Sequence, residues 1–314
     1  MKAAVIHAPR DLRIEDSEVA ALGPHDVKLR VRAGGICGSD LHYYQHGGFG
    51  TVRIGQPMIL GHEVAGEVME TGAEVTRLHV GDRVAVNPSL ACGRCRYCLE
   101  GKANHCLDMH FNGSAMRLPH TQGLFREVLV CAEAQAVPVG PDVPLELVAF
   151  AEPLSVCLHA SRQAGPLQSR RVLVTGTGPI GALCVLVARH AGAREVVATD
   201  VADAPLTVAR RIGADLALNT RSDPQALDRF GADKGHFDVV FEAPGVAVAL
   251  ASALQAARPG ATVVQLGLSN GDMSVAMNMV VAKEINLRGS FRFHEEFAAA
   301  VDVLATGKID VREA

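Results

Sequence analysis

The sequence predicts two domains, a β domain followed by an α/β domain that is built on a parallel sheet. The chain has 314 residues, and a common domain has ~150. Residues 1 to about 150 contain short segments of alternating hydrophobicity, separated by turn residues. From about residue 170, compact apolar segments alternate with longer segments that are compatible with helices. The two halves of the chain differ in the period of their apolar residues, and we expect each half to fold around its own core.

Four segments of the first half alternate apolar and polar residues. They read VKLRVRA, HEVAGEVMETG, DRVAVNP and FREVLVC, and Gly, Pro, Asp and Asn residues separate them. Alternation over this length predicts strands with one buried face. Short strands with frequent turns are typical of an antiparallel barrel or sandwich.

The second half begins with the β-branched segment RVLVTG, which a glycine-rich turn follows. Strands that alternate with helices form βαβ units, and these units build a parallel sheet. Strands are predicted at 171–176, 195–200, 215–219, 237–245 and 261–267, and helices at 180–193, 204–215 and 246–260. A connecting helix is predicted near 150–168 and a last helix at 294–308, after which 309–311 would suit the start of a strand.

Composition excludes several classes of function. The net charge is −4, aromatic residues make up 4% of the chain, and there is no Trp. A partner with a phosphate backbone or stacked bases is therefore not expected. The apolar stretch 180–188 is too short to span a membrane. The N-terminus lacks the long apolar region of a signal peptide. We expect a cytoplasmic protein whose eight cysteines remain thiols.

A nucleotide site is predicted where the first strand of the second half meets its helix. Gly176, Gly178 and Gly181 form a G-x-G-x-x-G motif, with Pro179 and Ile180 between the last two glycines. The first glycine permits a tight turn, the second lets the backbone approach a pyrophosphate, and the third allows close packing of helix and strand. The helix N-terminus offers N–H groups and a positive dipole end to the phosphates.

Asp200 ends the next predicted strand, nineteen residues beyond Gly181. A carboxylate at this place can accept hydrogen bonds from both ribose hydroxyls of adenosine and would repel a 2′-phosphate. No Arg follows immediately, and we therefore expect NAD rather than NADP. The alternative is that Asp200 only caps the helix that follows.

Four cysteines lie close together in one segment with the spacing C-x₂-C-x₂-C-x₇-C. They are Cys92, Cys95, Cys98 and Cys106. Four thiolates can surround one tetrahedral Zn²⁺ and leave no position for water, which is typical of a structural site. The alternatives are a redox C-x-x-C pair, two disulfides or a nucleic-acid-binding zinc ribbon. Each fits less well, because the first leaves two cysteines unexplained and the others need an oxidising compartment or a basic surface.

A second metal site is possible at Cys37, His62 and Glu63. A thiolate, an imidazole and a carboxylate can hold a catalytic Zn²⁺ with a position open for water or substrate. Glu152, near the predicted domain boundary, could be a fourth, exchangeable ligand. Each residue also has an ordinary structural interpretation, namely a buried thiol, a turn residue, a charge at a strand end and an acid in the first turn of a helix.

Six segments together resemble the zinc-dependent medium-chain alcohol dehydrogenases. They are GGICGSDLH, LGHEVAGEV, VGDRVAVNP, CGRCRYCLEGKANHC, AEPLSVCLHA and VLVTGTGPIGAL, in the family's order over nearly the whole chain. The resemblance implies a GroES-like β-barrel catalytic domain at 1–150 and a Rossmann domain with a doubly wound parallel sheet at 151–293. Residues 294–314 would return towards the first domain. Family members usually continue past this point, and if Ala314 is the natural end, we expect the β domain to lack part of its sheet.

The resemblance also implies roles for individual residues. Cys37, His62 and Glu63 match the catalytic zinc ligands, with Glu152 binding directly or through water. Ser39 and His42 match a proton relay, and Tyr43 a tyrosine of the substrate pocket. Arg292 matches an arginine that lines the polyol pocket, although it could instead be a surface or phosphate-pairing arginine.

Within the family, CGSDLHYY, the His–Glu pair and EPLSV are similar to the polyol branch. The stretch FNGSAMRLPHTQGLFREVLV is most similar to the L-idonate 5-dehydrogenases. This resemblance implies transfer of hydride between NAD and a secondary alcohol of a sugar acid or polyol. Sorbitol or xylitol and L-threonine dehydrogenases are the alternatives among enzymes, and an inactive nucleotide-binding regulatory protein is the alternative outside them. The family also implies a homo-oligomer, a tetramer or a dimer.

Overall fold

The computed structural model describes residues 1–269 and 271–314, and in it the chain divides into two units. The first consists of Met1–Glu152 and Phe297–Thr306, and the second of Pro153–Glu296 and Gly307–Ala314. Among the described helices, none has both the length and the apolar character that crossing a membrane requires.

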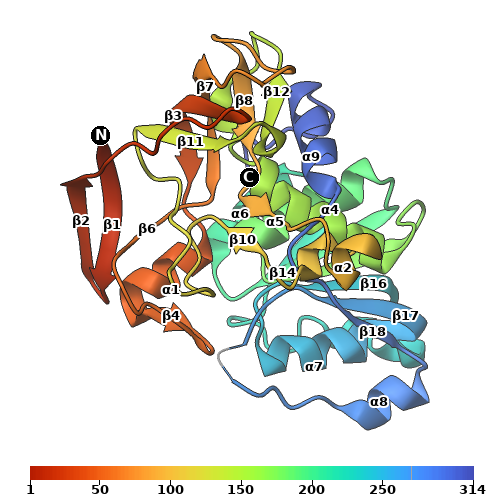
Figure 1. Ribbon diagram of the computed structural model, residues 1–314. Helices are drawn as coiled ribbons and strands as arrows, with labels where there is room; N and C mark the ends of the chain where they lie inside the picture. Colours follow the sequence, from red (N-terminus) through yellow and green to blue (C-terminus); the bar gives the residue numbers. More distant parts are fainter. Residues whose placement is uncertain (270) are drawn as a thin grey trace. The chain divides into compact units, whose positions relative to one another are not determined.

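An antiparallel sheet of five strands, in the order β11-β3-β7-β8-β12, forms the centre of the first unit (Figure 1). Alternate residues of β3 (Asp26–Gly35) face inward, among them Val27 and Leu29, and pack with Val64 and Val84 of the neighbouring strands. Arg32 faces outward and pairs with Glu67 of β7. The other strands of this sheet are β7 (Glu63–Thr71), β8 (Arg83–Val86), β11 (Val128–Ala132) and β12 (Ala136–Val139).

Smaller elements complete the first unit. Tyr43 of α1 (Gly38–His46) packs with Ile6 and Met58 in a separate apolar cluster. The remaining strands are β1 (Lys2–Ala8), β2 (Asp11–Asp16), β4 (Gly48–Phe49), β5 (Val52–Arg53), β6 (Met58–Ile59), β9 (Ser89–Leu90) and β10 (His110–Phe111). The helices are α2 (Arg96–Leu99), α3 (Leu145–Val148), α9 (Glu296–Ala305), whose first residue belongs to the second unit, and the 3₁₀ turns η1 (Ala103–His105) and η2 (Glu133–Gln135).

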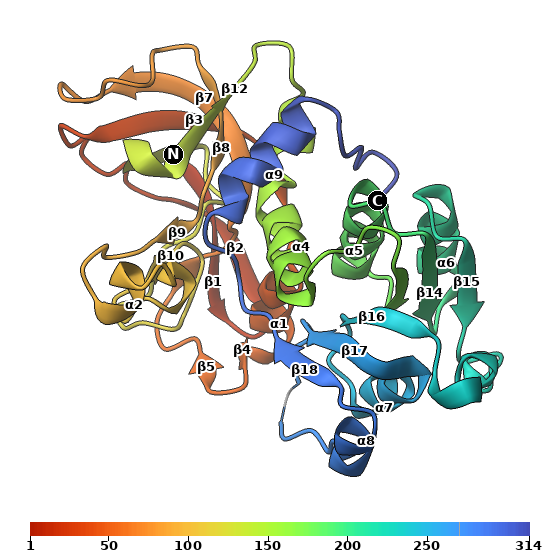
Figure 2. The same ribbon diagram turned by 90° about the vertical axis from the view of Figure 1, so that its right-hand side faces the viewer.

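The second unit contains a parallel sheet of six strands in the order β15-β14-β13-β16-β17-β18 (Figure 2). The order reverses between β13 and β16, and in open parallel sheets ligands bind at the carboxyl ends of the strands at such a switch point. The predicted α/β half is confirmed. The strands are β13 (Arg171–Thr175), β14 (Glu195–Asp200), β15 (Leu216–Asn219), β16 (Phe237–Glu242), β17 (Ala257–Gln265) and β18 (Asn286–Gly289).

Helices cover this sheet, with α5 and α6 against β13, β14 and β15 and α7 against β16 and β17. Leu250 and Leu254 of α7 pack on Phe237, Val240 and Val263 of the sheet. The helices of the second unit are α4 (Ala151–Ala164), whose first two residues belong to the first unit, α5 (Pro179–His190), α6 (Asp203–Arg211), α7 (Ala247–Ala256), α8 (Met277–Ala282), η3 (Asp228–Phe230) and η4 (Ala232–Lys234).

Several element boundaries differ from the predictions. The helix predicted at 246–260 ends at Ala256, because Ala257 already pairs with Phe237 of the sheet and Gly260 has a φ of 74°. The connecting helix predicted near 150–168 is α4, which ends at Ala164, and the short helix α3 precedes it. Residues 309–311 form no strand.

Candidate metal centres and nucleotide-binding edge

Cys37, His62 and Glu63 come together in the first unit. One ligand atom from each lies within 4.8 Å of the others. Cys37 is the residue that precedes α1, and His62 and Glu63 lie at the start of β7. β3 and β7 bring them together, because Gly35 at the end of β3 pairs with Glu63.

Two glycines make this close approach possible. A Cβ atom at Gly35 would lie 2.1 Å from Oε2 of Glu63. Gly61 has a φ of 89°, and a Cβ there would lie 2.3 Å from the ring of Phe125. A side chain at either position would displace a ligand or the turn that presents it.

Asp40 positions both ligand-bearing turns, a role that the sequence analysis missed. Its side chain is 3% exposed. One carboxylate oxygen accepts a hydrogen bond from the N–H of Cys37 at 3.0 Å, and the other accepts one from Gly61 at 3.1 Å. Nδ1 of His62 lies 3.9 Å from the same carboxylate. The signal in the sequence is an acid three residues into α1, where it completes a capping box.

The electrostatics of the three ligands favour a bound cation. Burial, and next the charge of Glu63, raise the pKa of the Cys37 thiol to about 11. Burial also raises the pKa of Glu63. Nδ1 of His62 is buried and has no hydrogen-bond partner within the described part of the chain. A thiolate and a carboxylate buried together need a compensating positive charge. Sulfur, nitrogen and oxygen ligands in this number fit Zn²⁺ with a position left open.

The other predicted residues of this region lie on α1 and α4. Ser39, two residues beyond Cys37, partly offsets the effect of burial by lowering the pKa of the Cys37 thiol through its hydroxyl and N–H. His42 is half-buried, with its ring 6.1 Å from that of Phe49. Tyr43 is 1% exposed, and its hydroxyl accepts a hydrogen bond from the N–H of Ala115 at 3.0 Å. Glu152 is buried in the first turn of α4. Among the described residues, the gathered ligand set does not include Glu152.

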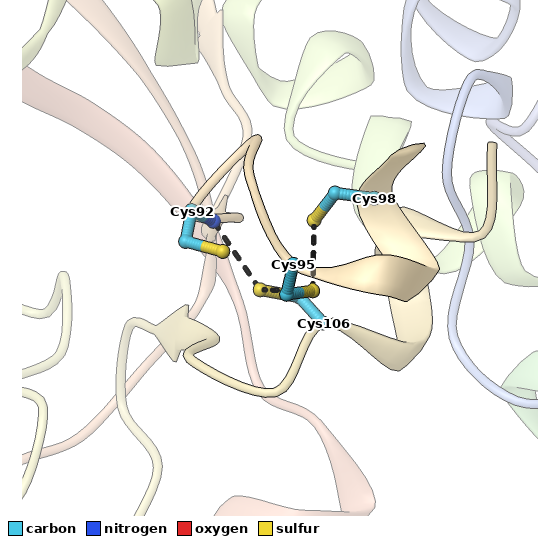
Figure 3. A group of neighbouring side chains, drawn as sticks. All are labelled: Cys92, Cys95, Cys98 and Cys106. Carbon is cyan, nitrogen blue, oxygen red and sulfur yellow. Dashed lines mark hydrogen bonds between the residues drawn. The ribbon is translucent and has the colours of Figure 1, made fainter. Parts of the chain in front are cut away.

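The four cysteines Cys92, Cys95, Cys98 and Cys106 gather around one point (Figure 3). The sulfur of Cys95 lies 3.5 Å from that of Cys98 and 4.0 Å from that of Cys106. Sulfurs bound tetrahedrally to zinc at 2.3 Å are about 3.8 Å apart. All four are free thiols, and their spacing fits a closed zinc site.

Backbone N–H groups around these cysteines stabilise thiolates. Leu107 donates to the sulfur of Cys95 at 3.5 Å, and Asp108 donates to that of Cys106 at 3.3 Å. Backbone hydrogen bonds, led by that of Leu107, lower the pKa of Cys95 to about 6. Burial and the neighbouring sulfurs raise the pKa of Cys98 to about 12. Without a cation, the close sulfurs cannot all be deprotonated at little cost. A bound cation would lower that cost, because it stabilises all four thiolates at once.

The glycine motif forms the turn between β13 and α5, as predicted. Gly176 has a φ of 72°, and a Cβ on Gly181 would lie 1.8 Å from the carbonyl oxygen of Gly176. A Cβ on Gly178 would meet no atom within 4 Å. The space beside Gly178 is therefore open for the close approach of a phosphate, and Pro179 and Ile180 begin the helix behind it.

Asp200 ends β14 beside this turn. One of its carboxylate oxygens accepts a hydrogen bond from the N–H of Thr177 at 2.8 Å, and the other accepts one from Ala202 at 3.0 Å. The carboxylate is thus tied to the glycine motif and also caps the turn that leads to α6. Arg292 follows β18 with a φ of 55°, and its guanidinium lies 5.0 Å from the centre of the Phe291 ring.

Comparison with known proteins places these sites in a family. Residues 23–141 match the model of the alcohol dehydrogenase GroES-like domain, and residues 179–306 match that of the zinc-binding dehydrogenases. The chain is 44% identical over 282 residues to the L-idonate 5-dehydrogenase (NAD(P)(+)) of Escherichia coli, which covers 90% of this chain and 81% of that protein. This chain belongs to the zinc-binding alcohol dehydrogenase family. It is an oxidoreductase of the alcohol and polyol dehydrogenase type.

Further relatives agree with this assignment. The sorbitol dehydrogenase of Bacillus subtilis is 34% identical over 316 residues, covering 99% of this chain and 88% of that protein. The crystal structure of the Escherichia coli L-idonate 5-dehydrogenase matches with a TM-score of 0.94 and 40% identity, over 98% of this chain and 88% of that one. A zinc-binding dehydrogenase of Sinorhizobium meliloti bound to NADP matches with a TM-score of 0.90 and 29% identity, over 99% and 90%.

Proposed function

We propose that this dehydrogenase oxidises carbon 5 of L-idonate to give 5-keto-D-gluconate, with NAD as the hydride acceptor. The observation that carries the proposal is the close approach of Cys37, His62 and Glu63. One ligand atom of each, a sulfur, a ring nitrogen and a carboxylate oxygen, lies within 4.8 Å of the others. Similarity to the Escherichia coli L-idonate 5-dehydrogenase supports the choice of substrate. We propose that Glu152 serves as a fourth, exchangeable ligand of the same zinc.

Zinc held by these ligands would lower the pKa of the substrate hydroxyl, and NAD would accept the hydride released from the same carbon. The residues of α1 carry the proton away. The Ser39 hydroxyl favours the thiolate of Cys37, two residues earlier in the chain, by lowering the pKa of that thiol. His42 is three residues further along α1, which places the two side chains on neighbouring turns of one helix face. A half-buried imidazole can accept the proton and pass it to water.

Two further residues are assigned to the substrate. Arg292, on the turn after β18, is proposed to meet a hydroxyl or the carboxylate of the sugar acid, since a guanidinium binds a carboxylate with paired hydrogen bonds. Tyr43 is proposed to support the wall of the substrate pocket. Its hydroxyl accepts a hydrogen bond from the N–H of Ala115, and its ring lies 5.6 Å from that of Phe49.

NAD is proposed as the preferred cofactor. Asp200 would accept the ribose hydroxyls, and Asp203 adds a second carboxylate, held by the amide of Asn219 at 2.7 Å. Two negative charges at this edge would repel a 2′-phosphate. The four cysteines Cys92, Cys95, Cys98 and Cys106 are proposed to hold a structural zinc.

We propose a homo-oligomer in the cytoplasm. The edge strand β18 is mostly exposed, and an unpaired edge of this kind can pair with the same edge of a second copy. The eight cysteines are free thiols, four of them close together, and a reducing compartment would keep them in this state.

A panel of substrates tests the proposed reaction. Formation of NADH is followed with L-idonate, sorbitol, xylitol and L-threonine, using zinc-loaded protein. We expect the highest kcat/KM with L-idonate. Faster turnover of sorbitol would favour the sorbitol dehydrogenase alternative, which the similarity to the Bacillus subtilis enzyme supports. Absence of turnover with every alcohol would favour a regulatory protein.

A further inference from the structure

Glu242 is a buried carboxylate for which the proposed reaction has no use. It ends β16 and is 0% exposed. It accepts hydrogen bonds from the N–H of Gly245 at 3.0 Å and of Val246 at 3.2 Å, and from the side-chain amide of Gln265. Burial raises the pKa of Glu242, although these three donors oppose it. A buried carboxylate is costly unless it is hydrogen-bonded, and a buried polar network whose groups are satisfied makes its surroundings rigid.

Through these bonds Glu242 joins the turns that follow β16 and β17. Its backbone carbonyl accepts the N–H groups of Leu266 at 2.9 Å and Gly267 at 3.1 Å, while its side chain holds Gly245 and Val246. The turns touch, since a Cβ on Gly267 would lie 2.0 Å from the nitrogen of Gly245. The two turns therefore form one rigid piece at the carboxyl ends of the strands.

This piece lies directly against the glycine motif. The N–H of Ala243 donates to the carbonyl of Thr175 at 3.1 Å. A Cβ on Gly176 would lie 2.7 Å from the ring of Pro244. β13 and β16 are neighbours across the switch point of the sheet, where dinucleotides bind in folds of this type. The turn at 243–246 thus forms a wall beside the turn that would hold the pyrophosphate.

We propose that Glu242 is a positioning residue for the dinucleotide, which keeps the turn at 243–246 in contact with Gly176 before the cofactor binds. The inference rests on the proposed dinucleotide-dependent function. Glu242 touches neither the cofactor nor the substrate in this account. Its carboxylate, together with the amide of Gln265, holds the turn whose Pro244 lies against Gly176. A preformed turn lowers the ordering cost of binding, and its loss should appear in the affinity for the cofactor.

The same strand offers a matched control. Asp238, at the amino end of β16, is also acidic and largely buried. Its carboxylate accepts the N–H of Arg171 at 2.8 Å and Nε of Arg258 at 2.7 Å. Glu242→Gln and Asp238→Asn should therefore both lower the melting temperature. Only the first variant disturbs the carboxyl edge of the sheet.

Calorimetric titration of the zinc-loaded protein with NAD measures the Kd of each variant, and melting is recorded without cofactor. We expect Glu242→Gln to raise the Kd about tenfold, the size of effect that weakened hydrogen bonds to a charged acceptor produce. Asp238→Asn should leave the Kd unchanged. If Glu242→Gln does not fold, Gln265→Met removes one donor, and its Kd should rise while its zinc content stays at the wild-type value.

An unchanged Kd in Glu242→Gln, or in Gln265→Met where that variant replaces it, would overturn the inference while the proposed function stands. An equal rise in Kd for Asp238→Asn would also overturn it, because the effect would then follow stability alone. A wild-type chain that binds neither NAD nor NADP would overturn the proposed function and this inference together.

Discussion

At the scale of single residues, the candidate catalytic site depends on positions where a side chain is missing as much as on the ligands themselves. Gly35 leaves room for the carboxylate of Glu63, and Gly61 leaves room for the ring of Phe125. Asp40 then joins the turns of Cys37 and Gly61 with two hydrogen bonds. The ligand set is therefore preorganised by its neighbours, which is the usual requirement for a catalytic metal site.

Gly35→Ala should remove zinc from the catalytic site and spare the structural one. Its Cβ would fall 2.1 Å from Glu63 Oε2, and the carboxylate would have to move. We expect zinc content to fall from two atoms per chain to one, and turnover to be lost. Gly38→Ala is the control, because a Cβ there meets nothing within 4 Å. Two zinc atoms per chain in Gly35→Ala would show that zinc binding does not depend on the space beside Gly35.

Asp200→Ser should shift the preference between cofactors. The variant loses the charge that would repel a 2′-phosphate, and also a hydrogen bond from Thr177 that holds the glycine turn. Affinity for both cofactors should fall, and the ratio of kcat/KM for NAD to that for NADP is therefore the quantity to measure. We expect this ratio to drop about tenfold, as for the loss of one charged contact.

Asp215→Ser is the control for this ratio. Asp215 lies at the opposite, amino edge of the sheet, where it accepts the N–H of Val196 at 2.8 Å. We expect this variant to lower stability and leave the ratio unchanged. If Asp200→Ser also leaves the ratio unchanged, Asp200 serves only as a cap.

At the scale of elements, the sequence predicted the strands and helices better than their ends. Periodicity and the glycine turn located β13, α5 and β14, because these depend on neighbouring residues. The early end of α7 depends on the pairing of Ala257 with Phe237, twenty residues earlier in the chain. The bonds of Asp40 to Gly61 and of Glu242 to Gln265 are likewise distant in the sequence. The candidate metal ligands could be proposed from the sequence, and the residues that position them could not.

The start of α9 carries a charged contact that makes stability depend on pH. Burial alone would raise the pKa of Glu296, but hydrogen bonds from His159, at 3.1 Å, and from the N–H of His294, at 2.7 Å, lower it to about 2. Arg162 adds an ion pair at 3.0 Å. A lowered pKa means that the contact stabilises the fold above the ordinary value of 4.5 and that this is lost as the pH falls towards 2.

Glu296→Gln should therefore reduce the free energy of unfolding, and the difference from wild type should shrink from about pH 5 to about pH 3. Urea unfolding at several pH values measures this difference. Glu295→Gln is the control, because Glu295 is 70% exposed and pairs with Arg162 at the longer distance of 3.5 Å. If the difference in free energy of unfolding stays constant over this range, the ionised Glu296 carboxylate is not stabilised by its contact with His159.

At the scale of the whole molecule, the two candidate metal centres and the candidate nucleotide-binding turn lie in different units. The residues of both candidate metal centres belong to the first unit, and the glycine turn, Asp200 and Glu242 belong to the second. The family assignment rests on both, since each matches its own family model. The strand order β15-β14-β13-β16-β17-β18 in the second unit and the candidate metal ligands in the first unit are therefore two independent features that fit one dehydrogenase.

The central claim is that zinc is held by Cys37, His62 and Glu63. Anomalous diffraction at the zinc edge from crystals of protein purified without chelator tests it most directly. We expect two peaks per chain, one among Cys92, Cys95, Cys98 and Cys106 and one in contact with Cys37, His62 and Glu63. A single peak at the four cysteines, with none at the second position after zinc has been added, would contradict the account.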